Sequence, residues 1–431
     1  MIKKFISKFV KENGLPAYIY NGRNKTFNPE QDSVYYGGPL WSEDELHAII
    51  DAVMSGSWLV SGEKVSRFEK KFSSIINLKH SVMVNSGSSA NLAMISALKK
   101  RFSWNNDSEI IISTVGFPTT IAPVIQNNLK VVFTDITYDD LNFSLAEVES
   151  KITSNTKAIF VSPVLGNPPN IDKLVEISKK YDILLILDGC DSLGTKWKGK
   201  EIYEYFYCSS CSFYPAHHIT TGEGGMVSSN DKELIDIARS FAWWGRDCYC
   251  SGKGNLLSNG TCKKRFSCWL KDVGVPIDHK YLFSNIGYNL KPLDLQGAIG
   301  LVQLSRLDFI HKQRRKIKQR FEKYLNRIEG VRVISETSEE AETSWFGVPI
   351  LCDSPELKTK LLNYFEENRI QTRHYFAGNI LQHPAYRDYG DANSYPNASN
   401  VLKNVFFIGC SPSLNENAIN YVENKIIDFI K

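Results

Sequence analysis

The chain has 431 residues, of which 42% are hydrophobic and 23% charged, and its formal net charge is +4. This composition is typical of a globular protein with a sizeable core, and the lack of a long Lys/Arg run argues against a nucleic-acid or membrane-surface protein. The first ten residues, MIKKFISKFV, predict an amphipathic helix and not a secretory or membrane-spanning segment, so we expect a cytoplasmic protein. Nine cysteines, an odd number dispersed along the chain, disfavour a disulfide framework and leave thiol or metal chemistry open.

The first part of the chain predicts an N-terminal arm and then an anion site. Residues 1–45 form the arm, and Ser42 is a good N-cap for a following helix. A short buried strand, 82–84, then leads through the turn NSGSSAN into a helix over 92–99. A strand, a turn of small hydroxyl residues and a helix together bring free backbone N–H groups and the helix dipole to one point, which suits a phosphate. The alternative is that Ser88 simply caps the helix.

Alternating strands and helices follow and predict an α/β fold. The strands, at 110–113, 131–135, 158–164, 183–188 and 206–213, are continuous apolar runs, as expected of a mostly parallel sheet covered by helices on both faces. Ligands gather at the carboxyl ends of such strands. Asp188 closes the run ILLILD, where it could pair with a protonated pyridine nitrogen or serve as an ordinary cap or turn residue.

The second half of the chain predicts the end of a large domain and a smaller α/β domain. A helix over 232–241 precedes a polar loop, 246–270, and a helix begins at Asp294. A long basic helix over about 308–328 leads to strands near 331–335 and 344–351. We therefore predict an arm at 1–45, a large domain at 46–305 and a small domain at 306–431. The basic stretch His311 to Arg320 could dock an acidic partner or form a solvated face.

One polar stretch, residues 212–225, joins two predicted strands. It holds Ser212, the adjacent His217 and His218, and Glu223 within a glycine-rich turn. Polar groups held between two strands of one sheet are usually there for chemistry.

The order of these features resembles the fold type I, pyridoxal-phosphate-dependent sugar aminotransferase family (DegT/DnrJ/EryC/StrS), from about residue 35 to the end of the chain. In that family the segment reads S-F-x-x-x-K, and the lysine forms a Schiff base with the cofactor. Here His217 stands in the lysine position, five residues after Ser212. Imidazole cannot form a Schiff base, so the resemblance implies pyridoxamine 5'-phosphate (PMP), or pyridoxal phosphate (PLP), held without a covalent link.

The resemblance is to the family's sugar 3-dehydratases, on the segments SFYPAHHIT, NSGSSAN, LGNP and GYNLK. One kind of 3-dehydratase also carries a 2Fe-2S cluster on four spaced cysteines. Here 57 residues separate Cys190 from Cys248, one residue separates Cys248 from Cys250, and Cys262 follows after a longer gap than in the family pattern. The resemblance thus implies a cluster on Cys190, Cys248, Cys250 and Cys262, with Cys268 as an alternative fourth ligand. Cys208, Cys211, Cys352 and Cys410 are expected in the core.

Further roles follow from the resemblance alone. Gly87, Ser88 and Ser212 would bind the cofactor phosphate, with Asn289 reaching in from the other subunit of a homodimer. Phe117 would stack on the pyridine ring, Asp188 would pair with the ring nitrogen, and Asp191 would meet the ring hydroxyl. His217 would be the catalytic base. A role for His218 stays open.

The implied activity is removal of the 3-hydroxyl group from a nucleotide-linked 4-keto-6-deoxyhexose, CDP-4-keto-6-deoxyglucose, in 3,6-dideoxyhexose biosynthesis. Electrons would come through the cluster from a separate flavin/iron-sulfur reductase. Two alternatives stay open: a cluster-free GDP-4-keto-6-deoxymannose 3-dehydratase that takes its amine from glutamate, and a non-catalytic relative that binds sugar nucleotides. The residues do not determine which nucleotide is bound.

Overall fold

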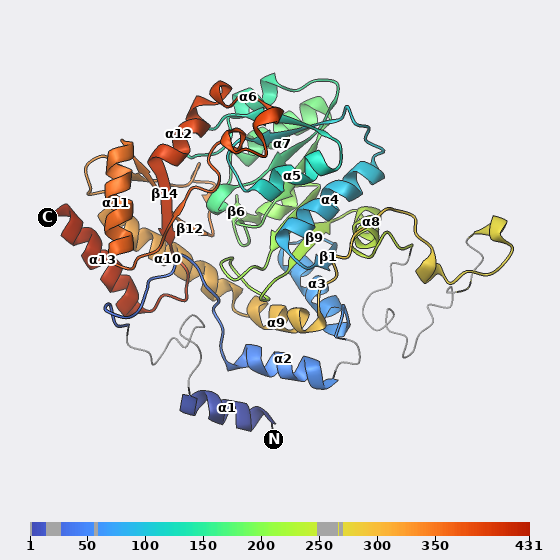
Figure 1. Cartoon of the computed structure of the whole chain (residues 1–431), viewed down its shortest axis with the longest axis horizontal. Helices are drawn as coiled ribbons and strands as arrows, with labels where there is room; N and C mark the ends of the chain where they lie inside the picture. The colour runs from blue at the N-terminus through green and yellow to red at the C-terminus, as the bar shows by residue number, and fades with distance from the viewer. Residues whose placement is uncertain (1, 14–26, 56–58, 248–265, 267–269) are drawn as a thin grey trace.

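A computed structural model describes residues 2–13, 27–55, 59–247, 266 and 270–431 (Figure 1). Within them lies a large mixed sheet of seven strands, in the spatial order β1-β9-β8-β5-β4-β2-β3. The strands are β1 (His80–Val84), β2 (Glu109–Ser113), β3 (Lys130–Thr134), β4 (Thr156–Val161), β5 (Leu184–Asp188), β8 (Cys208–Ser212) and β9 (Gly225–Ser229). The pairs among β3, β2, β4, β5 and β8 are parallel, whereas β9 runs antiparallel to both β8 and β1. The predicted mostly parallel α/β sheet is therefore confirmed.

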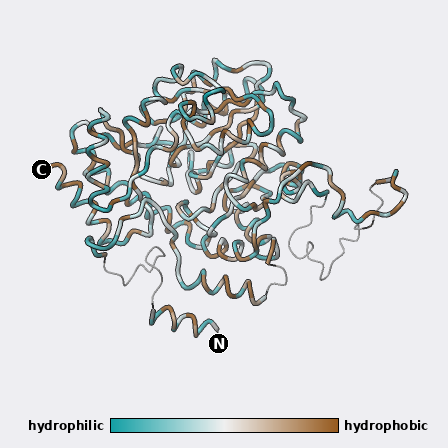
Figure 2. Tube along the Cα trace, in the orientation of Figure 1, coloured by the Kyte–Doolittle hydropathy of each residue, from teal (hydrophilic) through white to brown (hydrophobic). Residues whose placement is uncertain are grey.

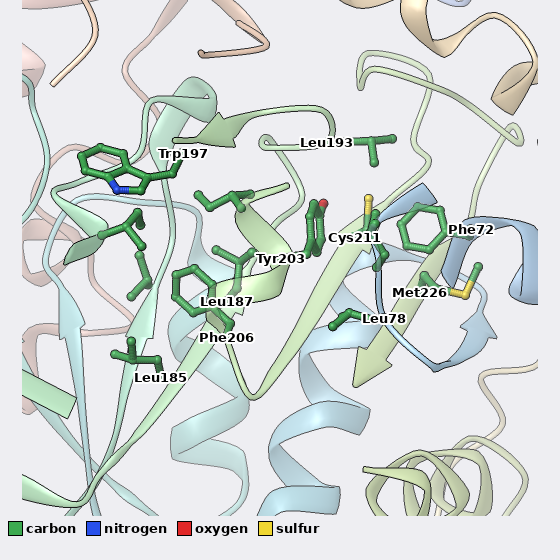
Figure 3. Close-up of a cluster of buried hydrophobic side chains, with 14 of the residues drawn as sticks. Phe72, Leu78, Leu185, Leu187, Leu193, Trp197, Tyr203, Phe206, Cys211 and Met226 are labelled. Carbon is green, nitrogen blue, oxygen red and sulfur yellow. The ribbon is translucent and has the colours of Figure 1, made fainter. Parts of the chain in front are cut away.

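Helices cover both faces of this sheet because successive strand residues point to opposite sides. In β5, Leu185 and Leu187 join one core cluster with Phe72 of helix α3 (Glu63–Ile75), whereas Ile186 joins the other cluster with Leu98 of helix α4 (Gly87–Arg101). Figure 3 shows side chains of the first cluster, among them Leu187, Tyr203 and Cys211. Continuous apolar strands are thus buried on both sides, as the sequence predicted.

The α-helices are distributed along the whole described part of the chain. They are α1 (Ile2–Asn13), α2 (Glu43–Ser55), α3 (Glu63–Ile75), α4 (Gly87–Arg101), α5 (Pro118–Gln126), α6 (Leu145–Ser150), α7 (Ile171–Tyr181), α8 (Lys232–Ala242), α9 (Asp294–Leu304), α10 (Leu307–Leu325), α11 (Pro355–Glu367), α12 (Pro396–Asn404) and α13 (Glu416–Ile430). Several begin at side-chain caps, such as Asn170 before α7 and Asp231 before α8. The predicted helix near the N-terminus is α1, which packs on α2 and carries both hydrophobic and hydrophilic residues along its length (Figures 1 and 2).

A second sheet of four strands lies in the C-terminal part, in the order β10-β12-β14-β13. Its strands are β10 (Val331–Val333), β12 (Gly347–Cys352), β13 (Thr372–His374) and β14 (Val405–Gly409), all antiparallel to their neighbours. The N-terminal segment reaches this sheet, because Val34 forms a bridge with Ile370. A small sheet of β6 (Lys196–Trp197), β7 (Lys200–Glu201) and β11 (Ala341–Glu342) links the two parts. The division at residues 45 and 305 stays a prediction.

The basic helix α10 is amphipathic: Lys312, Lys316 and Lys323 lie on a solvated face, whereas other basic residues of the helix are buried or paired. His311, Arg314 and Lys318 of this helix are buried. Two of its more exposed arginines are paired with acids, Arg315 with Glu342 and Arg320 with Glu416 and Glu423. The charges of this helix therefore hold it against its own chain.

The segment 270–288, drawn in yellow, extends away from the body at the right of Figure 1. It exposes several large apolar side chains to solvent, among them Tyr281 at 69% and Ile286 at 96%. None of the helices in the described part of the chain is long and apolar enough to cross a membrane.

Candidate functional site

A pocket of about 670 Å³ opens where strands β4, β5 and β8 of the seven-stranded sheet end and meet the part of the chain that holds the four-stranded sheet. We call these two walls of the pocket the large-domain side and the small-domain side. It is lined by Tyr36, Ser86, Gly87, Ser88, Asn91, Phe117, Pro118, Thr119, Ser162, Val164, Asp188, Cys190, Asp191, Ser212, Tyr214, Ala216, His217, Glu223, Phe346, Arg373, His374, Phe376, Ala377, His383 and Phe407. All predicted cofactor-binding residues except Asn289 are among them. Asn289 lies elsewhere, in a bridge with Trp243, and its reach into a partner's pocket stays a prediction.

The predicted anion-binding turn is formed by the start of α4. Ser86 caps this helix, with its side chain accepting a hydrogen bond from the Ser89 amide at 3.0 Å. The alternative that Ser88 is the cap is therefore wrong. The Ser88 hydroxyl instead donates to Thr119 at 2.9 Å. Helix geometry leaves the Gly87 and Ser88 amides without partners inside the helix, so they can bind an anion.

Gly87 allows α4 to approach the end of β8 closely. A Cβ atom at position 87 would stand 2.5 Å from the Ser212 Cβ, 2.8 Å from its hydroxyl and 3.0 Å from the Cys190 sulfur. Only glycine fits so close a contact. The Gly87 backbone and the Ser212 hydroxyl therefore lie side by side in the pocket, an arrangement that suits a phosphate group.

Asp188 is a buried carboxylate that is held in place by several donors. Its Oδ2 accepts hydrogen bonds from the Thr120 hydroxyl at 2.6 Å and from the Asn91 amide nitrogen at 2.8 Å. Ser210 donates to its Oδ1 at 3.4 Å. The carboxyl group is only 5% exposed, and these neutral donors fix its orientation at the wall of the pocket.

His217 lies in the turn that follows β8, and its ring enters the pocket. Its Nδ1 stands 3.3 Å from Asp191 Oδ1, close enough for an ion pair with a protonated ring but not aligned as a hydrogen bond. The ring also packs against Phe346 on the small-domain side, with 5.2 Å between the two ring centroids. Asp191 is fixed in turn by the Leu165 amide at 3.2 Å. A mostly buried imidazole beside a carboxylate is a suitable proton acceptor.

Arg314, which the sequence reasoning did not single out, fixes the turn that carries His217. Its guanidinium is buried and donates to the carbonyl oxygens of Ala216 and His217, at 3.3 and 3.2 Å. The other nitrogen donates to the carbonyls of Trp345 and Phe346, at 3.2 and 3.0 Å. One cation thus ties the large-domain turn to the small-domain segment against which the His217 ring packs.

His218 does not share the pocket with its neighbour. It is 3% exposed, and its Nε2 lies 2.5 Å from the carbonyl oxygen of Ser344. Burial, with Arg314 and His311 nearby, lowers the pKa of His218 well below its usual value. His311 bonds the Ser344 hydroxyl at 2.7 Å, and burial lowers its pKa to about 3. Both rings are buried core residues, and His218 is not among the residues that line the pocket.

Of the predicted cluster ligands, the structure describes Cys190 alone. Cys190 lines the pocket. Burial, and to a smaller extent the negative charge of Asp188, raises the pKa of its thiol well above the usual value. Cys248, Cys250, Cys262 and the alternative Cys268 lie outside the described residues. Within the described ranges, no three His, Cys, Asp or Glu residues are grouped to hold a metal ion. The cysteines expected in the core, at 208, 211, 352 and 410, are buried as predicted.

The small-domain side of the pocket was not predicted. Phe346, Phe376 and Phe407 pack there, with Phe376 and Phe407 stacked at 6.0 Å. Phe117, the predicted ring-stacking residue, lies across from them, 6.1 Å from Phe376. The sequence offered only one signal, the loop predicted around His374 to Pro384.

These residues fit a pyridoxal-type cofactor. The helix terminus and the Gly87–Ser212 contact form a phosphate cradle, Phe117 offers a ring face, and Asp188 is a fixed carboxylate for a ring nitrogen. The buried oxygen of Asn91 beside Asp188 has no partner within the described chain, as expected where a ligand completes a site.

Comparison with known proteins agrees with this geometry. The model of the DegT/DnrJ/EryC1/StrS aminotransferase family matches residues 41–427. The chain is 35% identical to dTDP-4-dehydro-2,6-dideoxy-D-glucose 3-dehydratase of Saccharopolyspora spinosa, over 96% of this chain and 90% of that protein. It is 36% identical to the lipopolysaccharide biosynthesis protein RfbH of Salmonella typhimurium, over 91% of this chain and 90% of that protein. A solved structure of E coli GDP-4-keto-6-deoxy-D-mannose-3-dehydratase with bound hydrated PLP is 29% identical, covers 91% of this chain and 99% of its own, and gives a TM-score of 0.79.

Proposed function

The chain belongs to the DegT/DnrJ/EryC1/StrS aminotransferase family, and on that premise we propose that it is an enzyme acting on sugar nucleotides, a 3-dehydratase. It removes the 3-hydroxyl group of a nucleotide-linked 4-keto-6-deoxy sugar, with PMP or PLP held noncovalently. The main support is His217, an imidazole in the lysine position, mostly buried beside Asp191. Relatives that match nearly the whole chain are named as 3-dehydratases, which supports the same reaction.

The residues that would hold the cofactor are those already described. Gly87, Ser88 and Ser212 would bind the phosphate, Phe117 would cover the ring, and Asp188 would pair with the ring nitrogen. Asp191 would stand beside the ring hydroxyl. When bound, the cofactor supplies an amine and an electron-accepting pyridinium ring.

His217 would move the proton. Because its Nδ1 faces Asp191, Nε2 is the nitrogen left to take a proton from a carbon in the pocket. Arg314 fixes the backbone on which the ring stands, and Phe346 limits the ring's movement. An imidazole cannot link covalently to the cofactor, so an ordinary aminotransferase cycle is disfavoured.

The finer form of the proposal is a CDP-4-keto-6-deoxyglucose 3-dehydrase with a 2Fe-2S cluster on Cys190, Cys248, Cys250 and Cys262, reduced by a flavin/iron-sulfur reductase. The cysteine spacing supports it, as does the position of Cys190 in the pocket wall. The alternative is a cluster-free dehydratase that uses glutamate, and a solved relative named as a GDP-4-keto-6-deoxymannose-3-dehydratase holds a PLP-glutamate adduct, at 29% identity.

We also propose that the enzyme is a homodimer. The segment 270–288 exposes Val275, Tyr281, Phe283 and Ile286 on one projecting arm, with Tyr281 and Ile286 more than two-thirds accessible. Such an apolar surface on a single chain is typical of an interface.

The test is one anaerobic preparation, assayed for cofactor, iron, sulfide and turnover. We expect PMP or PLP without a lysine linkage, and release of a 3-deoxy product from a 4-keto-6-deoxy sugar nucleotide. Iron and sulfide, with dependence on a reductase, would support the cluster form, whereas dependence on glutamate would support the alternative. A protein that binds the sugar nucleotide and never turns it over, with either electron or amine source, would be a non-catalytic relative.

The substitution His217→Lys tests whether a histidine at this position is required for dehydration. We expect the lysine to become linked to the cofactor, so that borohydride reduction adds the cofactor's mass to the peptide holding residue 217, and dehydration is lost. His218→Lys is the matched control, and its peptide should gain no mass. Normal dehydration by His217→Lys would contradict the role of His217.

A further inference from the structure

The structure assigns a second anion site to the small-domain side of the pocket. We propose that Arg373 binds an oxyanion of the substrate, the diphosphate of the sugar nucleotide or the carboxylate of an amine donor. This inference rests on the proposed function for its choice of ligands, but not for the existence of the site.

Arg373 is the only lysine or arginine among the described residues that line the pocket. The lining carboxylates, Asp188, Asp191 and Glu223, belong to the opposite side. In the described part of the chain no carboxylate is paired with Arg373. Its one hydrogen bond runs from Nη1 to the carbonyl of the adjacent Thr372, at 2.7 Å. An exposed guanidinium with most of its donors unused faces the pocket.

The side chain is nevertheless held in place. Its guanidinium lies 4.1 Å from the centroid of the Tyr36 ring, an arrangement that fixes the plane of the group while its donor edge stays open. Tyr36 itself packs edge-on against Phe407 at 6.2 Å, and its amide reaches Gln371 at 3.5 Å. Gly409 allows this approach, because a Cβ atom there would stand 2.3 Å from the Tyr36 carbonyl oxygen.

A second cation stands behind this surface. The Lys358 ammonium lies 3.3 Å from Nδ1 of His374, which lines the pocket next to Arg373. The small-domain side therefore presents positive charge, whereas the phosphate cradle of the large domain uses backbone amides and hydroxyls. Two anion sites of different construction lie in one pocket.

This division fits a ligand with two separated anionic groups, one on the cofactor and one on the substrate. Guanidinium groups bind phosphate and carboxylate with paired hydrogen bonds. The cofactor phosphate is served by α4 and β8, so Arg373, on β13, is left for an anion of the reacting partner.

The test measures binding without turnover. Arg373→Gln and Arg373→Lys, both loaded with cofactor, are titrated calorimetrically with CDP, GDP, dTDP and L-glutamate. For one ligand class we expect Arg373→Gln to raise the Kd by about 10- to 100-fold, and Arg373→Lys to recover part of the loss. Arg387→Gln is the matched control, since Arg387 is an exposed arginine of the same domain that does not line the pocket.

Loss confined to the nucleotides would identify the anion as the diphosphate, and loss confined to glutamate would identify it as the donor carboxylate. Unchanged Kd values for all four ligands in Arg373→Gln, with cofactor retained, would overturn the proposal. If the wild-type protein binds a nucleoside diphosphate through Arg373 but never dehydrates a sugar, the proposed function fails and this site stands.

Discussion

The two sides of the pocket are built in different ways. On the large-domain side, polar residues come from short turns at strand ends and fix one another, as Thr120 and Asn91 fix Asp188. On the small-domain side, Phe346, Phe376 and Phe407 form an aromatic surface beside Arg373, which has no carboxylate partner among the described residues. The difference indicates a division of labour: the first side is rigid enough to hold reacting groups, and the second offers shape and charge for recognition.

This division predicts how substitutions should act. Changes on the large-domain side should lower kcat or weaken cofactor binding, whereas changes on the small-domain side should raise the KM or Kd of the substrate.

The largest effect is expected from His217→Asn. Loss of a positioned general base lowers rates by about 10²- to 10⁴-fold, so we expect kcat to fall within that range while the Kd for the nucleotide stays unchanged. His218→Asn is the matched control; its kcat should change little because His218 is bonded to Ser344 in the core. Equal losses in both variants would show that the two histidines are not functionally distinct.

Arg314→Met should break the contrast, because Arg314 holds both sides. The substitution leaves four carbonyl oxygens without their donor. We therefore expect the free energy of unfolding to fall by about 3 kcal/mol. In protein that remains folded, kcat should fall and KM should rise together. Arg315→Met, one residue along and paired at the surface with Glu342, should cost less than about 1 kcal/mol. A variant as stable and active as wild type would contradict the proposed tie.

Acid should lower the free energy of unfolding, because His311 is buried between the two sides of the pocket and resists protonation. Its pKa is lowered from 6.5 to about 3 by burial, with Arg314, Arg315 and Lys196 adding positive charge. Below pH 6.5 the unfolded chain takes up a proton that the folded chain does not, so stability falls as the pH drops from 6.5 toward 3. The slope is about 1.4 kcal/mol per pH unit for this group.

Urea unfolding at pH 6.5 and pH 5 measures this effect. We expect His311→Gln to lose about 2 kcal/mol less than wild type over that interval. The difference in the free energy of unfolding between the two proteins at pH 6.5 measures the effect of the substitution itself and is subtracted. Identical pH slopes in the two proteins would contradict a neutral, buried His311.

The smallest effect is expected from Gly87→Ala. The added Cβ would stand 2.5 Å from the Cβ of Ser212, so the start of α4 must shift. Its backbone N–H groups would then no longer point toward the phosphate site. We expect the cofactor Kd to rise by about tenfold, with nucleotide binding at Arg373 retained. Equilibrium dialysis of cofactor measures the change, and Gly116→Ala, where a Cβ would meet open space, is the control.

The sequence predicted the large-domain side well because its residues sit in contiguous stretches. Gly87, Asp188 and Ser212 each end a strand or follow one, so periodicity and turns locate them. The small-domain side could not be predicted, because Tyr36, Phe346, Arg373 and Phe407 are far apart in the chain and meet only through tertiary packing. The same limit applies to Arg314, since a basic residue on a charged helix resembles a surface residue until the fold buries it.

Local ambiguity explains the remaining differences. Ser86 and Ser88 are equally good caps by composition, and only the backbone conformation at Ser86 decides between them. His217 and His218 are adjacent and chemically identical, yet the turn after β8 directs one into the pocket and the other toward Ser344.

Arg314 also bears on how such a site could change during evolution. It holds Ala216, His217, Trp345 and Phe346 by their carbonyl oxygens, which every amino acid possesses. The side chain at position 217 can therefore be exchanged while the turn beneath it keeps its shape. Exchange of lysine for histidine at this position, which the family resemblance implies, would therefore not require the scaffold to be rebuilt.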